Sequence, residues 1–364
     1  MFYISHVNLK NFRCFKNKSI QLSKKINVLV GKNAIGKTSI AEAIYYTGCC
    51  KSPRTSLDKE LIKKDEEYFI IELSTVTDGE EDRLKIINNL KGKKVFKNEK
   101  IFLKLSDYIG EFKVVLFSPE DLRLVKGEPE IRRRFLDLFI SQIDKKYLNS
   151  LIRYKKILKQ KNEYLKNEVS QIDRIYLKTL VKALAIEALV LIDKRKEYIN
   201  AINEVFNTKL LTISGNKEYG KLLYKPNTNM ENLIDVFMEN IEADILMKTT
   251  LKGPHKDDFE FIINGDKASS FASQGQQKSL ALTLKLSQSE IYKKKSDKIV
   301  IILDDVFGEL DNERQNNIIE LLSEDVQIII TTTTAEGLSE KVKETSKVID
   351  MNEDGDTYEW KRLW

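Results

Sequence analysis

Two glycines, a lysine and a threonine stand at fixed spacing near the start of the chain, in the pattern Gly31-x-x-x-x-Gly36-Lys37-Thr38. Glycines let consecutive backbone N–H groups turn toward an anion, and a helix N-terminus adds partial positive charge. In this Walker A pattern the lysine reaches the β- and γ-phosphates, and the threonine hydroxyl binds Mg²⁺. The segment therefore predicts binding of ATP and Mg²⁺. The predicted nucleotide-binding residues are Gly31, Lys32, Asn33, Ala34, Ile35, Gly36, Lys37, Thr38 and Ser39.

The residues around this loop match the elements that must position it. An apolar, strand-like stretch over residues 26–30 comes before it, and the residues from Thr38 to Tyr46 predict a helix after it. A strand, a glycine-rich loop and a helix in this order form the context that the motif requires. A chance glycine-rich turn is therefore the less favoured explanation.

An acidic pair follows a second apolar strand, in the segment KIVIILDDVFGELD at 298–311. The continuous apolar run before it is typical of a buried parallel strand. Asp304 would hold Mg²⁺, directly or through water, and Asp305 could orient the attacking water. A plain turn or helix cap is the alternative. We predict Lys37, Asp304 and Asp305 as catalytic residues, and Thr38 and Asp304 as the Mg²⁺ ligands.

The segment FASQGQQ at 271–277 precedes an apolar helix predicted over 280–286. It resembles the signature motif of ABC-type ATPases, in which serine and glycine lie at a helix N-terminus and bind an anion. A bare string of this kind is more often only a helix cap, but its place ahead of the Asp304 strand favours the signature motif. In that class two heads enclose ATP, so the predicted residues act on the nucleotide of a second copy: Ser273, Gln274, Gly275 and Gln276.

The composition indicates a globular chain of two or three domains, with 364 residues, 41% hydrophobic content and charges of both signs. The three cysteines have no framework spacing, which argues for a reducing compartment. The first residues lack the apolar core of a signal peptide, and no apolar run approaches the length of a membrane span. We therefore predict a cytoplasmic protein without a membrane partner.

The pattern along the chain predicts three parts. Residues 1–127 carry the Walker A motif and strands of a β-meander, including 68–76 and 82–97. Residues 128–247 form a helical arm, roughly 50 Å long if about 35 residues stay helical at 1.5 Å per residue. That arm ends in a loop over 214–229 and a helix over 232–246. Residues 248–364 carry the signature motif and the Asp304 strand.

Seven local strings carry a resemblance to a known family. They are ISHVNLKNFRCF at 4–15, GKNAIGKTSIAEAIYY at 31–46, KSPRTS at 51–56, FSPEDLRLVKGEPEIRRRFLD at 117–137, GPHKDD at 253–258, FASQGQQKSLAL at 271–282 and LDDVFGELD at 303–311. With these strings the chain resembles the RecF family, bacterial recombination-repair ATPases of the SMC-like branch, over essentially its whole length.

The resemblance implies an α/β fold: an ABC/SMC-type P-loop ATPase head, split into N- and C-terminal halves, with an inserted short helical arm. It implies that ATP drives two heads into a homodimer, that the dimer binds double-stranded DNA including gapped or junction DNA, and that slow hydrolysis acts as a switch. It also implies work with RecR and RecO, and indirectly with RecA, whose loading onto single strands it assists.

Clustered basic residues suggest where DNA would lie. Residues 51–64 carry five basic and two acidic groups, and resemblance to SMC heads places Arg54 near both nucleotide and DNA. Lysine and arginine arrays bind phosphates without sequence preference. The predicted DNA-binding residues are Lys51, Arg54, Lys59, Lys63 and Lys64.

Two other basic clusters have open alternatives. Residues 144–166 carry eight basic and two acidic groups, and either bind DNA or form a solvated helix face. The arginines at 132–134 either contact phosphate or, as we favour, pair with carboxylates such as Asp137. His255 either lies near the ATP face or stabilises a turn.

Some positions depart from the generic ABC pattern. Asp305 stands where a glutamate is usual, and is one methylene shorter, which suits a switch better than a motor. Threonines at 331–334 stand where a switch histidine is usual, so either Thr331 or Thr332 could sense the γ-phosphate. No Q-loop glutamine is obvious, and residues 118–120 are the place to look.

Three other functions compete with DNA repair. One is the ATPase subunit of a membrane transporter, which the long insertion between Lys37 and Ser273 disfavours. Another is a nuclease-associated defence ATPase, for whose nuclease domain no residues are left. The last is an SMC-like structural chromosome protein with an inert ATP site.

Overall fold

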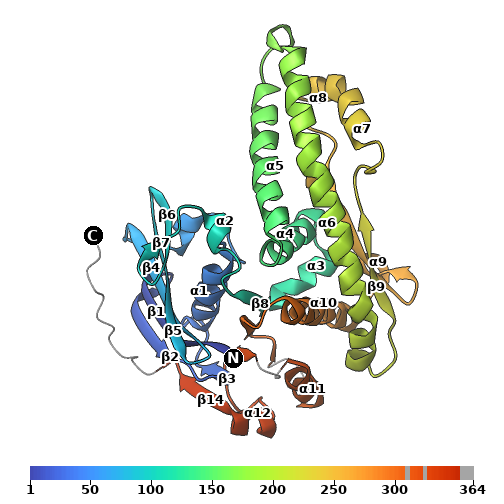
Figure 1. The fold of residues 1–364 in the computed structure, drawn as a ribbon. Coiled ribbons are helices and arrows are strands. Elements are labelled where there is room, and N and C mark those ends of the chain that lie inside the picture. Colours follow the sequence, from blue (N-terminus) through green and yellow to red (C-terminus); the bar gives the residue numbers. More distant parts are fainter. Residues whose placement is uncertain (308–311, 323–325, 353–364) are drawn as a thin grey trace. The chain divides into compact units, whose positions relative to one another are not determined.

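The computed structural model describes residues 1–307, 312–322 and 326–352. The chain forms two compact units, one of Met1–Glu120 with Gln288–Trp364 and one of Asp121–Ser287 (Figure 1). The functional division predicted above, with boundaries near residues 127 and 247, is a different partition and stays a prediction.

The first unit contains a parallel sheet built from both ends of the chain. Its strand order is β14 (Ser346–Asp350), β3 (Ile26–Val30), β13 (Gln327–Thr332), β12 (Ile299–Asp304) and β8 (Lys113–Phe117). All neighbours pair in parallel, and every residue of β12 and β13 is buried. Burial on both faces explains the continuous apolar runs at 299–303 of β12 and 328–330 of β13. The strands predicted over 26–30 and directly ahead of Asp304 are confirmed as β3 and β12.

A second, antiparallel sheet accompanies it in the same unit. Its order is β2 (Phe15–Gln21), β1 (Phe2–Phe12), β4 (Tyr68–Thr77), β5 (Glu80–Asn89), β6 (Gly92–Lys97) and β7 (Lys100–Ile101). The predicted strands at 68–76 and 82–97 belong to it, and the β4–β5 turn at Asp78 and Gly79 has positive φ at both residues. This sheet is therefore the predicted β-meander.

Helix α1 (Lys37–Cys49) contacts strands of both sheets and is buried along most of its length. At Gly48 a Cβ would lie 2.8 Å from Val114, so a side chain there would push the helix away from β8. Glycine is the helix-weakening choice elsewhere, but here it permits close packing. The shorter elements of this unit are η1 (Asp58–Leu61), α2 (Leu105–Tyr108), η2 (Pro119–Asp121), α11 (Asn312–Leu322) and α12 (Glu340–Thr345).

The second unit is mainly helical. Helix α6 (Arg174–Ser214) has 41 residues and so spans about 60 Å, longer than expected. It packs along α5 (Lys145–Tyr164), and α4 (Pro129–Ser141) lies near the base of the pair (Figure 1). The other helices are α3 (Leu122–Lys126), η3 (Val169–Gln171), α7 (Leu233–Glu239), α8 (Ile241–Met247), η4 (Pro254–Lys256), α9 (Ala268–Phe271) and α10 (Gln274–Lys295), whose last turns belong to the first unit.

The prediction for 214–246 was wrong in two details. The expected loop contains strand β9 (Gly220–Lys225), which pairs antiparallel with β10 (Asp258–Ile263), itself paired with β11 (Asp266–Lys267). The expected helix over 232–246 is two helices that meet at Asn240. Only Leu222 of β9 is buried, so the strand lacks the alternation that would have revealed it.

Candidate nucleotide site

The Walker A loop connects β3 to α1 in the predicted order. Ala34 and Gly36 have positive φ values of 66° and 106°. At Gly36 a Cβ would lie 2.2 Å from the Phe15 ring, so both the backbone conformation and the packing require glycine. The loop thus turns its backbone at the N-terminus of α1, where N–H groups have no acceptor within the helix and can bind an anion.

Lys37 is held inside this loop by the loop's own carbonyls. Its Nζ lies 2.5 Å from the carbonyl oxygen of Gly31 and 2.9 Å from that of Lys32. The residue is only 7% exposed. An ammonium group at this position lies within the curve of the loop, where a Walker A lysine meets the phosphates.

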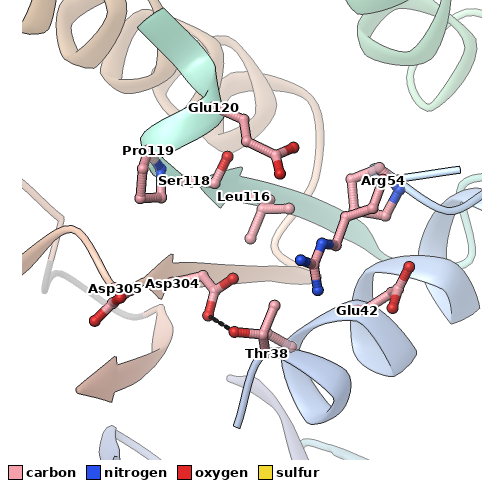
Figure 2. Close-up of a pocket in the computed structure, with 11 residues that line it drawn as sticks. Thr38, Glu42, Arg54, Leu116, Ser118, Pro119, Glu120, Asp304 and Asp305 are labelled. Carbon is pink, nitrogen blue, oxygen red and sulfur yellow. Dashed lines mark hydrogen bonds between the residues drawn. The ribbon is translucent and has the colours of Figure 1, made fainter. Parts of the chain in front are cut away.

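The carboxylate of Asp304 meets two hydroxyl groups at the end of β12. Thr38 Oγ1 donates to Asp304 Oδ1 over 3.0 Å, and Thr331 Oγ1 donates to the same oxygen over 2.6 Å (Figure 2). Burial raises the pKa of the Asp304 carboxyl above its ordinary value, although the two hydroxyl donors and the charge of Arg54 lower it in part.

This arrangement fits the predicted metal. Mg²⁺ prefers oxygen ligands and is usually held by one or two protein groups together with substrate phosphates. A carboxylate whose burial disfavours its charge would be stabilised by a bound divalent cation. Thr38 and Asp304 would therefore hold Mg²⁺, which would neutralise charge on the phosphates.

Asp305 takes a different direction from its neighbour. It has a positive φ of 56°, and its N–H contacts both the carbonyl oxygen and Oγ1 of Thr331, at 3.2 and 3.0 Å. In Figure 2 Asp304 turns toward Thr38, whereas Asp305 turns away from it. The two consecutive carboxylates therefore face different ways, as expected if Asp304 holds Mg²⁺ and Asp305 orients the attacking water. Both roles stay predictions.

These groups border one pocket of about 200 Å³ within the first unit (Figure 2). Residues 118–120, directly after β8, form part of its wall. They are the predicted place of a Q-loop, and none of them is glutamine. The pocket is lined by Thr38, Ala41, Glu42, Pro53, Arg54, Leu116, Ser118, Pro119, Glu120, Asp304 and Asp305.

The five predicted DNA-binding residues lie in the segment that connects α1 to β4 and contains η1, but in different settings. Arg54 lines the pocket and directs its guanidinium toward Asp304 and Thr38 (Figure 2). Lys63 is half-buried and donates to the carbonyl oxygen of Cys14 over 2.8 Å. The side chains of Lys51, Lys59 and Lys64 are exposed. The structure therefore places Arg54 at the nucleotide site, and contact of all five with DNA stays a prediction.

Glu42 is a residue of this site that the sequence did not single out. It lies on α1 and is 1% exposed. Its carboxylate accepts hydrogen bonds from Arg13 Nε and Nη2, at 2.7 Å each. Ser52 Oγ also donates to it, and the same Ser52 oxygen accepts the N–H groups of Arg54 and Thr55. Glu42 therefore fixes the turn that presents Arg54. Its only sequence signal is a carboxylate on an otherwise apolar helix.

We expect Glu42→Ala to loosen that turn. Hydrogen bonds to charged groups contribute about 1.5–3 kcal/mol each, so local opening of residues 52–61 should become easier by about 2–3 kcal/mol. Hydrogen–deuterium exchange over this loop measures the change. Glu204→Ala, at an exposed position of α6, is the control. Unchanged exchange at 52–61 in Glu42→Ala would show that Glu42 does not hold the turn.

The signature segment forms a reciprocal helix cap in the second unit. The N–H of Gln276 donates to Ser273 Oγ over 3.2 Å, and the N–H of Ser273 donates to Gln276 Oε1 over 2.9 Å. Ser273, Gln274 and Gly275 are exposed, and a Cβ at Gly275 would meet only Ser273 Oγ, at 3.9 Å. Packing of the described residues thus gives no reason for this glycine. Action on a second copy's nucleotide stays a prediction.

The other basic clusters have structural partners. Arg132 makes a bidentate ion pair with Asp258 at 2.7 and 2.8 Å, and Arg133 donates to the carbonyl oxygen of Asp257. The structural alternative is supported for these two arginines. Their partners are Asp258 and Asp257 rather than the suggested Asp137, which pairs with Arg195 and Lys155.

Within 144–166, four basic groups are engaged in ion pairs. One of them is Lys161, a lysine at an otherwise apolar position of α5, which is buried against Asp244 at 2.5 Å. His255 bonds Tyr154 and the carbonyl oxygen of Thr250, which supports its turn-stabilising role.

Together, the parallel sheet, the Walker A loop and the Thr38–Asp304 contact define a P-loop ATPase head of the ABC/SMC type. A family model described as "RecF/RecN/SMC N terminal domain" matches residues 3–357. The DNA replication and repair protein RecF of Bacillus cytotoxicus is 37% identical over 360 residues, which cover 96% of both chains. The chain belongs to the RecF family.

Solved structures agree with this assignment. The structure described as the recombination mediator protein RecF-ATP in the RecFOR pathway matches with a TM-score of 0.84 and 32% identity, over 92% of both chains. An Smc head bound to the C-winged helix domain of ScpA matches with a TM-score of 0.51 at 17% identity, over 92% of this chain and 90% of the other. This second likeness shows the fold alone. The family thus carries an ATP-binding head.

Among the residues that the structure describes, no helix combines the length and apolarity that crossing a membrane requires.

Proposed function

We propose that this chain is a weak, Mg²⁺-dependent ATPase of recombinational DNA repair that works as an ATP-gated DNA clamp in the cytoplasm. ATP would join two heads into a homodimer on double-stranded DNA near gaps or junctions, and slow hydrolysis would release it. In this proposal residues 1–127 and 248–364 act as the head, and 128–247 as the arm. RecR and RecO would be its partners, and RecA loading its outcome.

The observation that carries the proposal is the meeting of Thr38 and Asp304 in the pocket beside the Walker A loop. The two side chains come from opposite ends of the chain, and their oxygens lie 3.0 Å apart. When bound, Mg²⁺·ATP supplies the phosphoanhydride bond to be cleaved. Lys37 and the α1 N-terminus would bind its phosphates, and the exposed carboxylate of Asp305 would accept a proton from, or orient, the attacking water.

Dimerisation rests on the signature segment. Ser273 and Gly275 are exposed at the start of a capped helix, a geometry that offers N–H groups to an anion. If these groups bind the nucleotide of a second copy, ATP stabilises the dimer by linkage. The relatives named RecF and the RecFOR description support the repair role and the partners.

The test is the mass of the protein in solution, with and without ATP and Mg²⁺, and with duplex DNA. We expect ATP to convert monomer to dimer and to increase DNA retention. Ser273→Arg should abolish both, because its bulk and charge fill the place of the nucleotide, while binding of ATP to its own Walker A loop persists.

Ser170→Arg, an exposed serine of η3, controls for the added charge, and thermal unfolding controls for loss of the helix cap. If ATP changes neither the mass nor the DNA binding, or if Ser273→Arg still dimerises, the proposal of an ATP-gated clamp is wrong. Hydrolysis that survives Asp304→Ala would instead refute the assigned catalytic site.

A further inference from the structure

The buried hydroxyl group of Thr331 connects both carboxylate residues of the candidate site. Thr331 lies in β13 directly beside Asp304 of β12 and is fully buried. Its Oγ1 donates to Asp304 Oδ1 over 2.6 Å and accepts the N–H of Asp305 over 3.0 Å. A hydroxyl has one donor hydrogen, and that hydrogen is committed to Asp304. This argues against Thr331 as a γ-phosphate sensor, one of the two assignments suggested by the sequence.

The two contacts fix different features of the site. At Asp304, the hydroxyls of Thr38 and Thr331 both bond Oδ1. Within the described part of the chain, Oδ2 has no hydrogen bond that would compete with a cation. At Asp305, the bond to Thr331 stabilises a left-handed backbone that is uncommon outside glycine. That conformation directs the side chain of Asp305 away from Asp304 (Figure 2).

We propose that Thr331 is a positioning residue, which orients Asp304 toward Mg²⁺ and holds Asp305 in its outward conformation. The inference rests on the proposed function, because it assigns Asp304 as the metal ligand. Groups that orient a metal ligand typically contribute 10–100-fold to metal affinity. A threonine can do this in a fully buried strand because its β-branched shape fits the sheet.

The experiment measures metal affinity directly, without turnover. Mn²⁺ binding to the full chain with a non-hydrolysable ATP analogue can be followed by electron paramagnetic resonance. We expect Thr331→Val, which keeps the shape and removes the hydroxyl, to weaken Mn²⁺ binding about tenfold or more. Thr331→Ser should restore affinity to within about threefold, since it returns the donor. Analogue binding in EDTA should not change in either variant.

Thr47→Val is the matched control. Thr47 is also fully buried, but its hydroxyl donates only to Ala43 of its own helix, over 2.8 Å. Its loss should leave Mn²⁺ affinity unchanged. If Thr331→Val binds Mn²⁺ as tightly as the unchanged chain, the positioning role is wrong. It is also wrong if Thr331→Ser folds but binds Mn²⁺ as weakly as Thr331→Val.

Asp304→Asn separates this inference from the proposed function. It should weaken Mn²⁺ binding more than Thr331→Val does. An unchanged affinity in Asp304→Asn would overturn the metal site itself, and with it both proposals. A loss in Asp304→Asn without any loss in Thr331→Val would overturn only the role of Thr331.

Discussion

Replacing Lys37 with alanine is expected to abolish ATP binding at concentrations that saturate the unchanged protein. The ammonium group lies inside the Walker A loop, 2.5 and 2.9 Å from two loop carbonyls, where it would bind two phosphate groups at once. Hydrogen bonds to charged groups contribute about 1.5–3 kcal/mol each, so losing two should weaken binding about 100-fold or more. Titration with a fluorescent ATP analogue measures the change.

Lys32→Ala is the matched control for this experiment. Lys32 lies in the same loop, and its predicted part in nucleotide binding is its backbone N–H, which alanine keeps. Its side chain is exposed, and its contact with Lys37 is through its backbone oxygen. Its removal should change affinity by less than about threefold, as expected for one screened surface charge. Equal losses in the two variants would mean that general positive charge, rather than the position of Lys37, binds the nucleotide.

The elements around the phosphate loop could be predicted because their patterns are local. The apolar runs at 26–30 and 299–303 are buried on both faces of one sheet, and so show no polar alternation that could be misread. The Walker A glycines report directly on backbone conformation: Gly36 has a φ of 106° and packs against Phe15. Such signals need no knowledge of distant residues.

The features that the sequence did not reveal depend on partners far along the chain. Glu42 and Arg13 are 29 residues apart, and the buried Lys161 finds Asp244 after 83 residues. A lysine that interrupts an apolar seam predicts a break in packing, unless a buried carboxylate satisfies it. The sequence could not distinguish the two threonines that it suggested as γ-phosphate sensors. In the structure the hydroxyl of Thr331 donates to Asp304, whereas that of Thr332 donates to the carbonyl oxygen of Thr334.

Arg195→Met is expected to destabilise the helical unit more than any other single change discussed above. Arg195, almost fully buried on α6, bonds Asp137 of α4, Tyr147 of α5 and Asp257, each within 3.0 Å. It therefore links α6 to three other segments of the chain. Removing one partner of a buried ion pair costs about 3–5 kcal/mol, because the remaining charges lose their compensation. The midpoint of urea unfolding, followed by the helical circular dichroism signal, should fall accordingly.

Acid should weaken the same network in the unchanged protein. Burial alone would raise the pKa of the Asp137 carboxyl, but Arg195 and Lys155 outweigh it, so this pKa lies below its ordinary value. A carboxyl with a lowered pKa stabilises the fold above its unfolded pKa, about 3.9, and loses that contribution as the pH falls through the folded pKa. In Arg195→Met this pKa should rise, so acid sensitivity should begin at higher pH.

Arg153→Met distinguishes burial from ion pairing as the cause. Arg153 on α5 also makes a close ion pair, 2.5 Å from Glu187, but its side chain is 58% exposed. Water screens such a pair, so its loss should cost only about 0–1 kcal/mol. If both variants lose the same small amount, the Arg195 network is as dispensable as a surface pair. A large loss of stability confined to Arg195→Met would mean that burial gives this ion pair its strength. The buried network around Arg195 would then hold α4, α5 and α6 together at the base of the arm.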